Sequence, residues 1–187
     1  MNTTGGTTMD RTQFRGIFVI VTTPFTEDFR LDEAGLERTV AFCLAAGVHG
    51  LVANALASEG FYLSEAERRR AAEIVVAGAK GRVPAIIAVS APHYRHAAGF
   101  AEHAESIGAS AIMALPPSLH PSTAADIKAH YRGIAAASSL PLVVQNVVGQ
   151  GASPMSAALI AELVHEIPTA RFVKEESAYP AQTVGDI

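Results

Sequence analysis

The stretch VHGLVANALASEGFYLSEAERRRAAEIVVAGAKGRVPAIIAVS, residues 48–90, decides the fold. It begins and ends with short apolar runs, 48–54 and 83–90, which are rich in β-branched residues and too short for a typical helix. The segment between them has helical length, and Ser64 followed three residues later by Glu67 is a capping-box pattern that marks where a helix begins. This order predicts a strand, a helix and a second strand, the unit that joins parallel strands.

The same unit recurs along the chain. Six apolar runs are candidate strands, at residues 16–22, 48–54, 83–90, 110–116, 140–147 and 170–175. Amphipathic segments of helical length separate or follow them, at residues 31–47, 64–81, 93–109, 122–139 and 153–168. Candidate strands begin about every 30 residues, the length expected of repeated βα units. We therefore predict an α/β protein with a parallel sheet.

Parallel strands with helical crossovers form either an open doubly wound sheet or a closed eight-stranded barrel. The loop TTPFTEDFRLD (22–32) lacks the spaced glycines of a nucleotide-binding turn, which argues against the open sheet. A closed TIM (β/α)8 barrel is the other architecture that this pattern allows. Because such a barrel usually needs about 250 residues, we expect only about its first six βα units here. Residues 1–13 are expected to form a flexible N-terminal tail, and residues 14–187 a partial barrel domain.

Two outer strands would then lack a neighbour on one side. Unpaired strand edges and uncovered apolar surface promote association. We expect that these residues are part of a longer chain and that alone they are oligomeric or poorly soluble. An autonomous sheet of six strands remains the alternative.

Composition excludes several classes of function. The chain has 187 residues, a net charge of −4 and no basic stripe, so nucleic acid is not an expected partner. Cys43 is the single cysteine, which excludes a disulfide framework and fits a reducing compartment. No apolar run has membrane-spanning length, and the polar start lacks the apolar core of a signal peptide. We expect a cytoplasmic protein without a membrane partner.

Clustered histidines and arginines have simple interpretations. His93, His96 and His103 have helical spacing, but no acid or cysteine cluster accompanies them, so we expect solvent-facing residues and no metal site. The run Arg68–Arg70 is interpreted as a solvated helix face.

The segment RFVKEES (171–177) places a lysine at the end of the sixth apolar run. Side chains alternate along a strand, so Phe172 and Lys174 share one face and Val173 takes the other. An apolar barrel interior disfavours the charged ammonium, which makes the Lys174 amine a better nucleophile. The position also suits catalysis, because barrels place their chemistry at the carboxyl ends of strands. The alternative is a lysine that reaches water and pairs with Glu175 or Glu176.

Five segments together resemble one known family, the dihydrodipicolinate synthase / N-acetylneuraminate lyase family of pyruvate-dependent class I aldolases. They are GIFVIVTTPFTEDFRLDEAGLERTV (16–40), AAGVHGLVANALASEGFYLSEAERRR (45–70), HAESIGASAIMALPP (103–117), LPLVVQNV (140–147) and RFVKEES. The resemblance runs from Phe14 to Ser177. It implies a TIM (β/α)8 barrel, of which about the first six βα units are present here. It also implies that Lys174 forms a Schiff base with the keto carbon of pyruvate or another 2-keto acid.

That resemblance implies a carbon–carbon or carbon–oxygen lyase that catalyses aldol cleavage, condensation or dehydration of a small 2-keto acid. No metal or organic cofactor is implied, and a homo-oligomer, a tetramer or dimer, is expected. A truncated, inactive remnant or interaction module of the same fold is the alternative. A phosphate-binding barrel isomerase is weaker, because its phosphate loops usually follow strands seven and eight.

Where the family usually has Gly-Thr-Thr-Gly-Glu after the second strand, this chain has ALASE, Ala55–Glu59. Leu56 and Ala57 stand where two threonines usually stand, Ser58 supplies a hydroxyl one place later, and Glu59 is retained. The resemblance therefore implies substrate binding by Ala57, Ser58 and Glu59. For Glu59 the structural alternative is strong, because an acid just before a helix is favourable in any protein.

Other family positions also differ. Two tyrosines that usually follow the double proline are Ser118 and Leu119, and His120 beside them is a weaker candidate substrate contact. An arginine that synthases use for a substrate carboxylate is replaced by Gln150.

Gln145 replaces the tyrosine that usually opens the fifth-strand motif, while Asn146 is kept. We assign Gln145 a catalytic role, positioning a substrate oxygen, and Asn146 a substrate-binding role. Glutamine does not titrate, so the usual threonine–tyrosine proton relay cannot operate and a true dihydrodipicolinate synthase is not expected. From the residues alone, both side chains could simply end a strand and satisfy backbone groups.

Overall fold

The computed structural model describes residues 14–118, 121–148 and 153–187. The expected tail at 1–13 and three residues discussed above, Leu119, His120 and Gln150, lie outside these ranges. The strands are β1 Phe18–Ile20, β2 Gly50–Ala53, β3 Ala85–Ala88, β4 Ala111–Ala114, β5 Leu142–Val147 and β6 Ala170–Glu176. The helices are α1 Glu33–Ala45, α2 Glu65–Ala79, α3 Tyr94–Ser106, α4 Ala124–Ala135, α5 Ala157–Glu166 and α6 Pro180–Asp186, with a 3-10 turn η2 at Leu56–Ser58.

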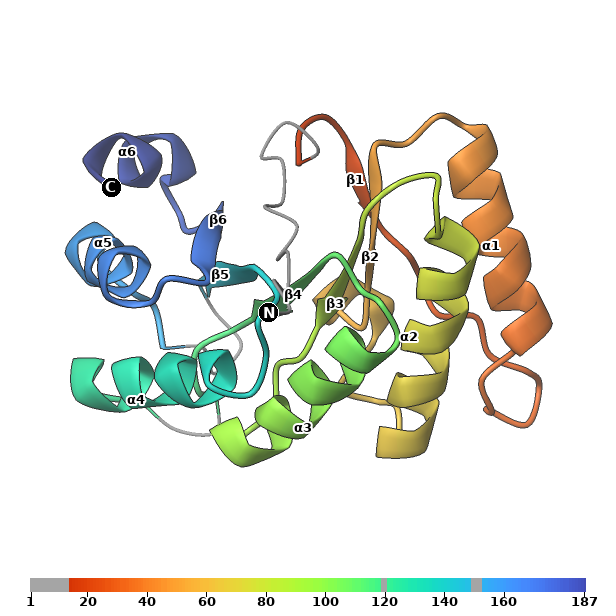
Figure 1. The fold of residues 1–187 in the computed structure, drawn as a ribbon, viewed down its shortest axis with the longest axis horizontal. Coiled ribbons are helices and arrows are strands. Elements are labelled where there is room, and N and C mark those ends of the chain that lie inside the picture. The colour runs from red at the N-terminus through yellow and green to blue at the C-terminus, as the bar shows by residue number, and fades with distance from the viewer. Residues whose placement is uncertain (1–13, 119–120, 149–152) are drawn as a thin grey trace, which may run out of the picture.

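The strands form one parallel sheet in the order β1-β2-β3-β4-β5-β6. Strand order therefore follows chain order without the reversal that defines a doubly wound sheet. The sheet curves, and α1 to α5 lie outside it (Figure 1). This half-barrel has the architecture of the first six βα units of a TIM barrel, which confirms the predicted fold class.

Local sequence signals set the helix ends. The Ser64 hydroxyl accepts a hydrogen bond from the Glu67 backbone N–H, and the Glu67 carboxylate accepts from the Ser64 backbone N–H, which confirms the predicted capping box. Thr123 and Asp126 form the same reciprocal pair at the start of α4. Gly47, at φ 79°, follows the end of α1, where the left-handed backbone that ends many helices favours glycine.

Side-chain alternation along the strands creates two apolar layers. The larger layer lies between the sheet and the helices and contains residues such as Leu51, Ile112 and Ile160, all fully buried. The smaller layer lies on the inner face of the sheet and contains Val52, Ile86, Ala88, Met113 and Val143. Each strand therefore presents every second side chain to the barrel interior.

Register between the last two strands includes one irregularity. Leu142 pairs with Ala170 and Val143 pairs with Phe172, so Arg171 is an extra residue in β6. Such a residue is a β-bulge, which changes the face that later residues of the strand occupy. The Arg171 side chain is exposed and donates from Nε to the Pro168 carbonyl at 2.6 Å.

Three phenylalanine rings connect the two outer strands of the sheet. The Phe14 ring stacks on Phe18 of β1, with centroids 5.7 Å apart, and on Phe172 of β6, with centroids 4.9 Å apart. All three rings pack against the inner apolar layer. Phe14 therefore joins strands that have no backbone pairing with each other.

We expect Phe14→Ala to lower the free energy of unfolding by about 2 kcal/mol, because a half-buried ring and two aromatic contacts are lost. Chemical denaturation followed by circular dichroism measures the change. Phe29→Ala is the matched control, since the Phe29 residue is 86% exposed. Equal effects of the two substitutions would show that the Phe14 contacts do not stabilise the sheet.

The interpretation of Arg68–Arg70 as a solvated face is wrong for Arg68. This residue is 6% exposed and donates to the carbonyls of Ala88 at 3.1 Å and Ser90 at 3.0 Å. Its guanidinium carbon lies 4.1 Å from the centre of the Phe100 ring. Desolvation lowers the pKa of Arg68 to about 10, so the group stays charged at neutral pH. Arg70, by contrast, is exposed and pairs with carboxylates, as a solvated face requires.

Candidate active site

Lys174 lies near the carboxyl end of β6 on the inner face of the sheet. It pairs in register with Gln145, two residues after the pair Val143 and Phe172. Phe172 packs on the inner apolar layer and Val173 on the outer one, so the predicted alternation is confirmed. The Lys174 side chain is 30% exposed. The Lys174 side chain is therefore partly accessible, next to the apolar layer that lines the inner face.

Three polar side chains meet at this point, and we call them the Lys174 cluster: Lys174, Gln145 and Glu176. Lys174 Nζ lies 3.2 Å from Glu176 Oε2. Gln145 Nε2 donates to the same oxygen at 2.6 Å. Glu176 stands two residues after Lys174 on the same strand, which places both on one face. The structure thus brings the two predicted catalytic residues together through a carboxylate that sequence reasoning treated only as a surface partner.

The Gln145 backbone is held from the outer side by Tyr131 of α4. The Tyr131 hydroxyl donates toward the carbonyls of Ala114 at 3.0 Å and Gln145 at 3.4 Å. Tyr131 is fully buried, and this burial raises its pKa well above the ordinary value of 10, so the hydroxyl remains a donor. Sequence reasoning missed Tyr131, although its place on the apolar stripe of the fourth helix is a signal that it faces the sheet.

Asn146 faces the outer layer instead. Its side-chain oxygen accepts from the Met155 N–H at 2.9 Å, and its amide donates to the Met155 carbonyl at 3.2 Å and to Glu175 Oε2 at 2.9 Å. Burial alone would raise the pKa of Glu175, but hydrogen bonds from Ser177 and Asn146 together lower it below the ordinary value. The structure does not bring the Asn146 amide and the Lys174 amine to one face. Substrate binding by Asn146 stays a prediction.

The segment after β2 supplies the other predicted site residues. Ala57 and Glu59 are exposed, whereas Ser58 is 1% exposed. The Ser58 carbonyl accepts from the Thr23 hydroxyl at 2.6 Å, and the Ser58 hydroxyl has no partner within the described part of the chain. Glu59 adopts a left-handed backbone at φ 56°. Substrate binding by Ala57, Ser58 and Glu59 therefore stays a prediction.

Histidines on α3 do not form a common site. His93 and His96 are exposed as predicted, but His103 is largely covered, with Nε2 3.2 Å from Glu73 Oε1. The solvent-facing assignment is therefore wrong for His103. Over residues 14–118, 121–148 and 153–187, no three histidine, cysteine or acidic side chains gather as a metal-binding set. In the same ranges, no helix has both the length and the apolar character to cross a membrane.

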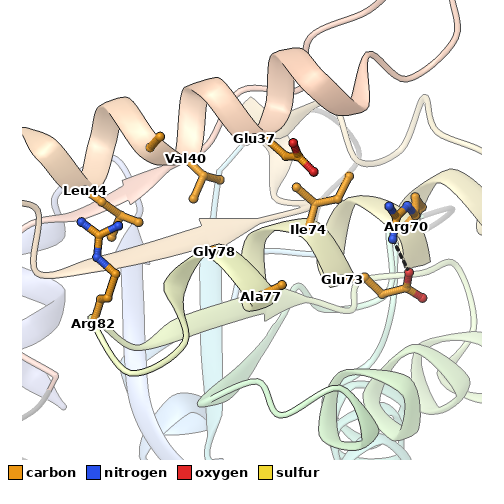
Figure 2. A pocket seen from close by; sticks show the side chains of 10 residues that line it. Glu37, Val40, Leu44, Arg70, Glu73, Ile74, Ala77, Gly78 and Arg82 are labelled. Atoms are coloured by element: carbon orange, nitrogen blue, oxygen red, sulfur yellow. Dashed lines mark hydrogen bonds and ion pairs between the residues drawn. The ribbon is translucent and has the colours of Figure 1, made fainter.

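A separate groove lies on the outer side of the molecule between α1 and α2 (Figure 2). Val40, Leu44 and Ile74 form an apolar floor, and charged side chains stand at both ends. None of the predicted site residues lines this groove. It is therefore distinct from the Lys174 cluster.

The fold and the Lys174 cluster define a class: parallel βα-barrel proteins that place polar chemistry at the carboxyl ends of their strands. A family model described as the dihydrodipicolinate synthetase family matches residues 13–182. The chain belongs to this family.

Relatives show how much of the family fold is shared. The chain is 36% identical over 165 residues to a 4-hydroxy-tetrahydrodipicolinate synthase of Acidiphilium cryptum, covering 88% of this chain and 56% of the relative. A Methanopyrus kandleri protein of the same name is 34% identical, with 88% and 55% covered. The crystal structure of dihydrodipicolinate synthase from Agrobacterium tumefaciens matches with a TM-score of 0.82 and 28% identity, covering 88% of this chain and 55% of that one. The chain spans about half the length of these relatives.

Proposed function

We propose that this chain carries the Schiff-base lysine of a lyase or aldolase that acts on pyruvate or another 2-keto acid. One observation carries the proposal: Lys174 lies on the inner face at the carboxyl end of β6, beside Gln145 and Glu176. Membership of a family of lyases and synthases supports the same chemistry. Aldol cleavage, condensation and dehydration all begin with the same step, attack of the amine on a keto carbon.

Each member of the Lys174 cluster has a proposed task. Lys174 supplies the nucleophilic amine, and the iminium ion that it forms withdraws electrons from the neighbouring carbon. Gln145 is 1% exposed and held by its backbone, so it offers a fixed hydrogen bond to a substrate oxygen. Ala57, Ser58 and Glu59, which follow β2, are proposed to bind the substrate. No metal or organic cofactor is required by this scheme.

We further propose that the substrate differs from that of the synthases. Gln145 stands where the resemblance expects a titrating tyrosine, and an amide can orient a substrate but cannot exchange its proton. Relatives that match the chain do carry the synthase name, so this part of the proposal departs from their names. Condensation of pyruvate with aspartate semialdehyde is therefore expected to be weak, and turnover of another keto acid better.

An inactive remnant or interaction module remains the second candidate. The ion pair between Lys174 and Glu176, with both side chains partly exposed, is the specific observation that favours it. Such a pair also forms when a lysine simply ends a strand near water. We also propose a homo-oligomer as the assembly in either case.

Trapping with borohydride tests the main proposal. After incubation with pyruvate and sodium borohydride, we expect one reduced pyruvyl group on the peptide that contains Lys174, found by mass spectrometry. The other lysines, Lys80 and Lys128, are internal controls because a nonspecific reaction would label them equally. An adduct confined to Lys80 or Lys128, or no adduct, would contradict the proposal.

A further inference from the structure

We propose that Glu176 is the acid–base residue for Lys174: its carboxylate takes a proton from the amine and returns it to the oxygen that leaves as water. This inference rests on the proposed function, since it concerns the formation of the same Schiff base. It assigns a catalytic role to a residue whose sequence position suggests only a strand end.

Geometry brings Glu176 into direct contact with the reacting atom. Glu176 Oε2 lies 3.2 Å from Lys174 Nζ, within reach of proton transfer. The side chains of Lys174 and Glu176 are 30% and 40% exposed, so a small molecule can reach both groups. The same Glu176 oxygen also accepts a hydrogen bond from the Gln145 amide at 2.6 Å.

Other polar groups near Lys174 do not fit this role. Gln145 cannot titrate. Glu175 points to the outer layer, where Asn146 and Ser177 bind its carboxylate. The Tyr131 hydroxyl is buried on the outer side against two carbonyls. Among the described residues, Glu176 is thus the acidic residue whose carboxylate contacts the Lys174 amine.

Schiff-base formation at Lys174 conserves protons and charge. The Glu176 carboxylate takes one proton from the Lys174 ammonium, and the free amine forms a bond to the keto carbon. A second proton moves from nitrogen to the former keto oxygen, which gives a neutral carbinolamine. Protonated Glu176 then donates its proton to that hydroxyl, the carbon–oxygen bond breaks and water leaves. An iminium cation remains beside the restored carboxylate, so the net charge is unchanged.

Gln145 has a second task in this scheme, since it also positions Glu176. Its amide N–H occupies one side of Oε2 and fixes the carboxylate beside the amine. Because the Gln145 side chain is nearly fully buried and its strand is paired with β6, this hydrogen bond has little freedom to move.

The test compares rates of Schiff-base formation in Glu176→Gln, Glu176→Ala and a matched control, Glu162→Gln. Glu162 also pairs with a lysine, at 2.5 Å from Lys128 Nζ, but lies on α5 away from the Lys174 cluster. We expect borohydride trapping of pyruvate on Lys174 to slow about 100-fold in Glu176→Gln, a typical loss for a general acid–base group. Glu162→Gln should trap at the original rate. Added formate should restore much of the rate in Glu176→Ala, because it supplies a carboxylate to the vacated space.

Each outcome decides between the two proposals. Trapping on Lys174 at an unchanged rate in Glu176→Gln would overturn the role of Glu176 and leave the proposed function standing. A slow rate in both Glu176 variants without rescue by formate would assign Glu176 a structural role and overturn the acid–base assignment. Absence of trapping on Lys174 in the unaltered chain would remove the proposed function and this inference with it. Thermal unfolding of each variant confirms that the compared proteins are folded.

Discussion

Replacing Lys174 with arginine is expected to abolish pyruvate chemistry, with a loss of at least about 1,000-fold. Arginine keeps the positive charge beside Glu176, but a guanidinium stays protonated and does not form a Schiff base. The measurement is exchange of the pyruvate methyl hydrogens in deuterated water, followed by proton NMR, since the enamine that forms from the imine promotes this exchange. Arginine therefore separates loss of the nucleophile from loss of the charge.

Lys128→Arg is the matched control for this substitution. Lys128 pairs with Glu162 and Glu166 on α5, and arginine can make the same pairs. Its exchange rate should equal that of the unaltered chain. Retained exchange in Lys174→Arg would show that another group, or no Schiff base at all, promotes the reaction.

Lowering the pH from 7 to 4 is expected to destabilise the fold by about 3 kcal/mol through His130 alone. His130 of α4 is 3% exposed, and its Nε2 has no hydrogen-bond partner within the described residues. Desolvation lowers the pKa of His130 from 6.5 to about 4, partly opposed by a hydrogen bond to the Leu115 backbone. Below pH 6.5 the histidine is protonated in the unfolded chain, whereas in the folded chain it is protonated only near pH 4 and below. The free energy of unfolding therefore falls as the pH is lowered through this window.

Urea unfolding at several pH values between 5 and 7 measures how the free energy of unfolding changes with pH. This range lies above the pH values at which most carboxylates are protonated. His130→Asn should flatten the slope, whereas His165→Asn, at an exposed position of α5, should leave it unchanged. An equal slope in the unaltered chain and in His130→Asn would mean that His130 binds its proton equally in the folded and unfolded states, which contradicts the prediction.

The sequence predicted the fold well because the relevant information is local. Short apolar runs, helical stripes and capping boxes repeat along the chain, and each βα unit is complete within a few tens of residues. Strand bounds were less certain: the run 16–22 contains only Phe18–Ile20 as β1, the residues that pair in register with Gly50–Val52 of β2. Pairing partners, rather than apolar character, fix where a strand ends.

Arg68 shows that a charged residue in a helix can be buried. It stands three and four residues before Ala71 and Ala72 on the buried stripe of α2, so its helical spacing indicated burial even though its charge suggested solvent. Its two terminal nitrogens donate to the carbonyls of Ala88 and Ser90, and its guanidinium lies over the Phe100 ring, contacts that no local pattern encodes.

The candidate site was predicted only in part, for a related reason. Strand alternation placed Lys174 on one face, but the contact between Gln145 and Glu176 depends on the register of β5 against β6. Asn146, one residue after Gln145, turns to the outer layer by the same alternation. Adjacent residues thus face different layers. Which side chains come into contact depends on the register between β5 and β6, whose residues are far apart in the sequence.

The bulge at Arg171 has a consequence for how insertions and deletions can accumulate in this gene. Loss of the Arg171 codon would leave Phe172 opposite Val143 and Lys174 opposite Gln145, because Arg171 is the unpaired residue. Loss of a codon between Phe172 and Lys174 would instead turn the amine toward the helices, since one residue reverses every later side chain. Loss of the one residue before Phe172 therefore leaves the Lys174 cluster unchanged. Loss of a residue between Phe172 and Lys174 moves the lysine to the other face of the sheet.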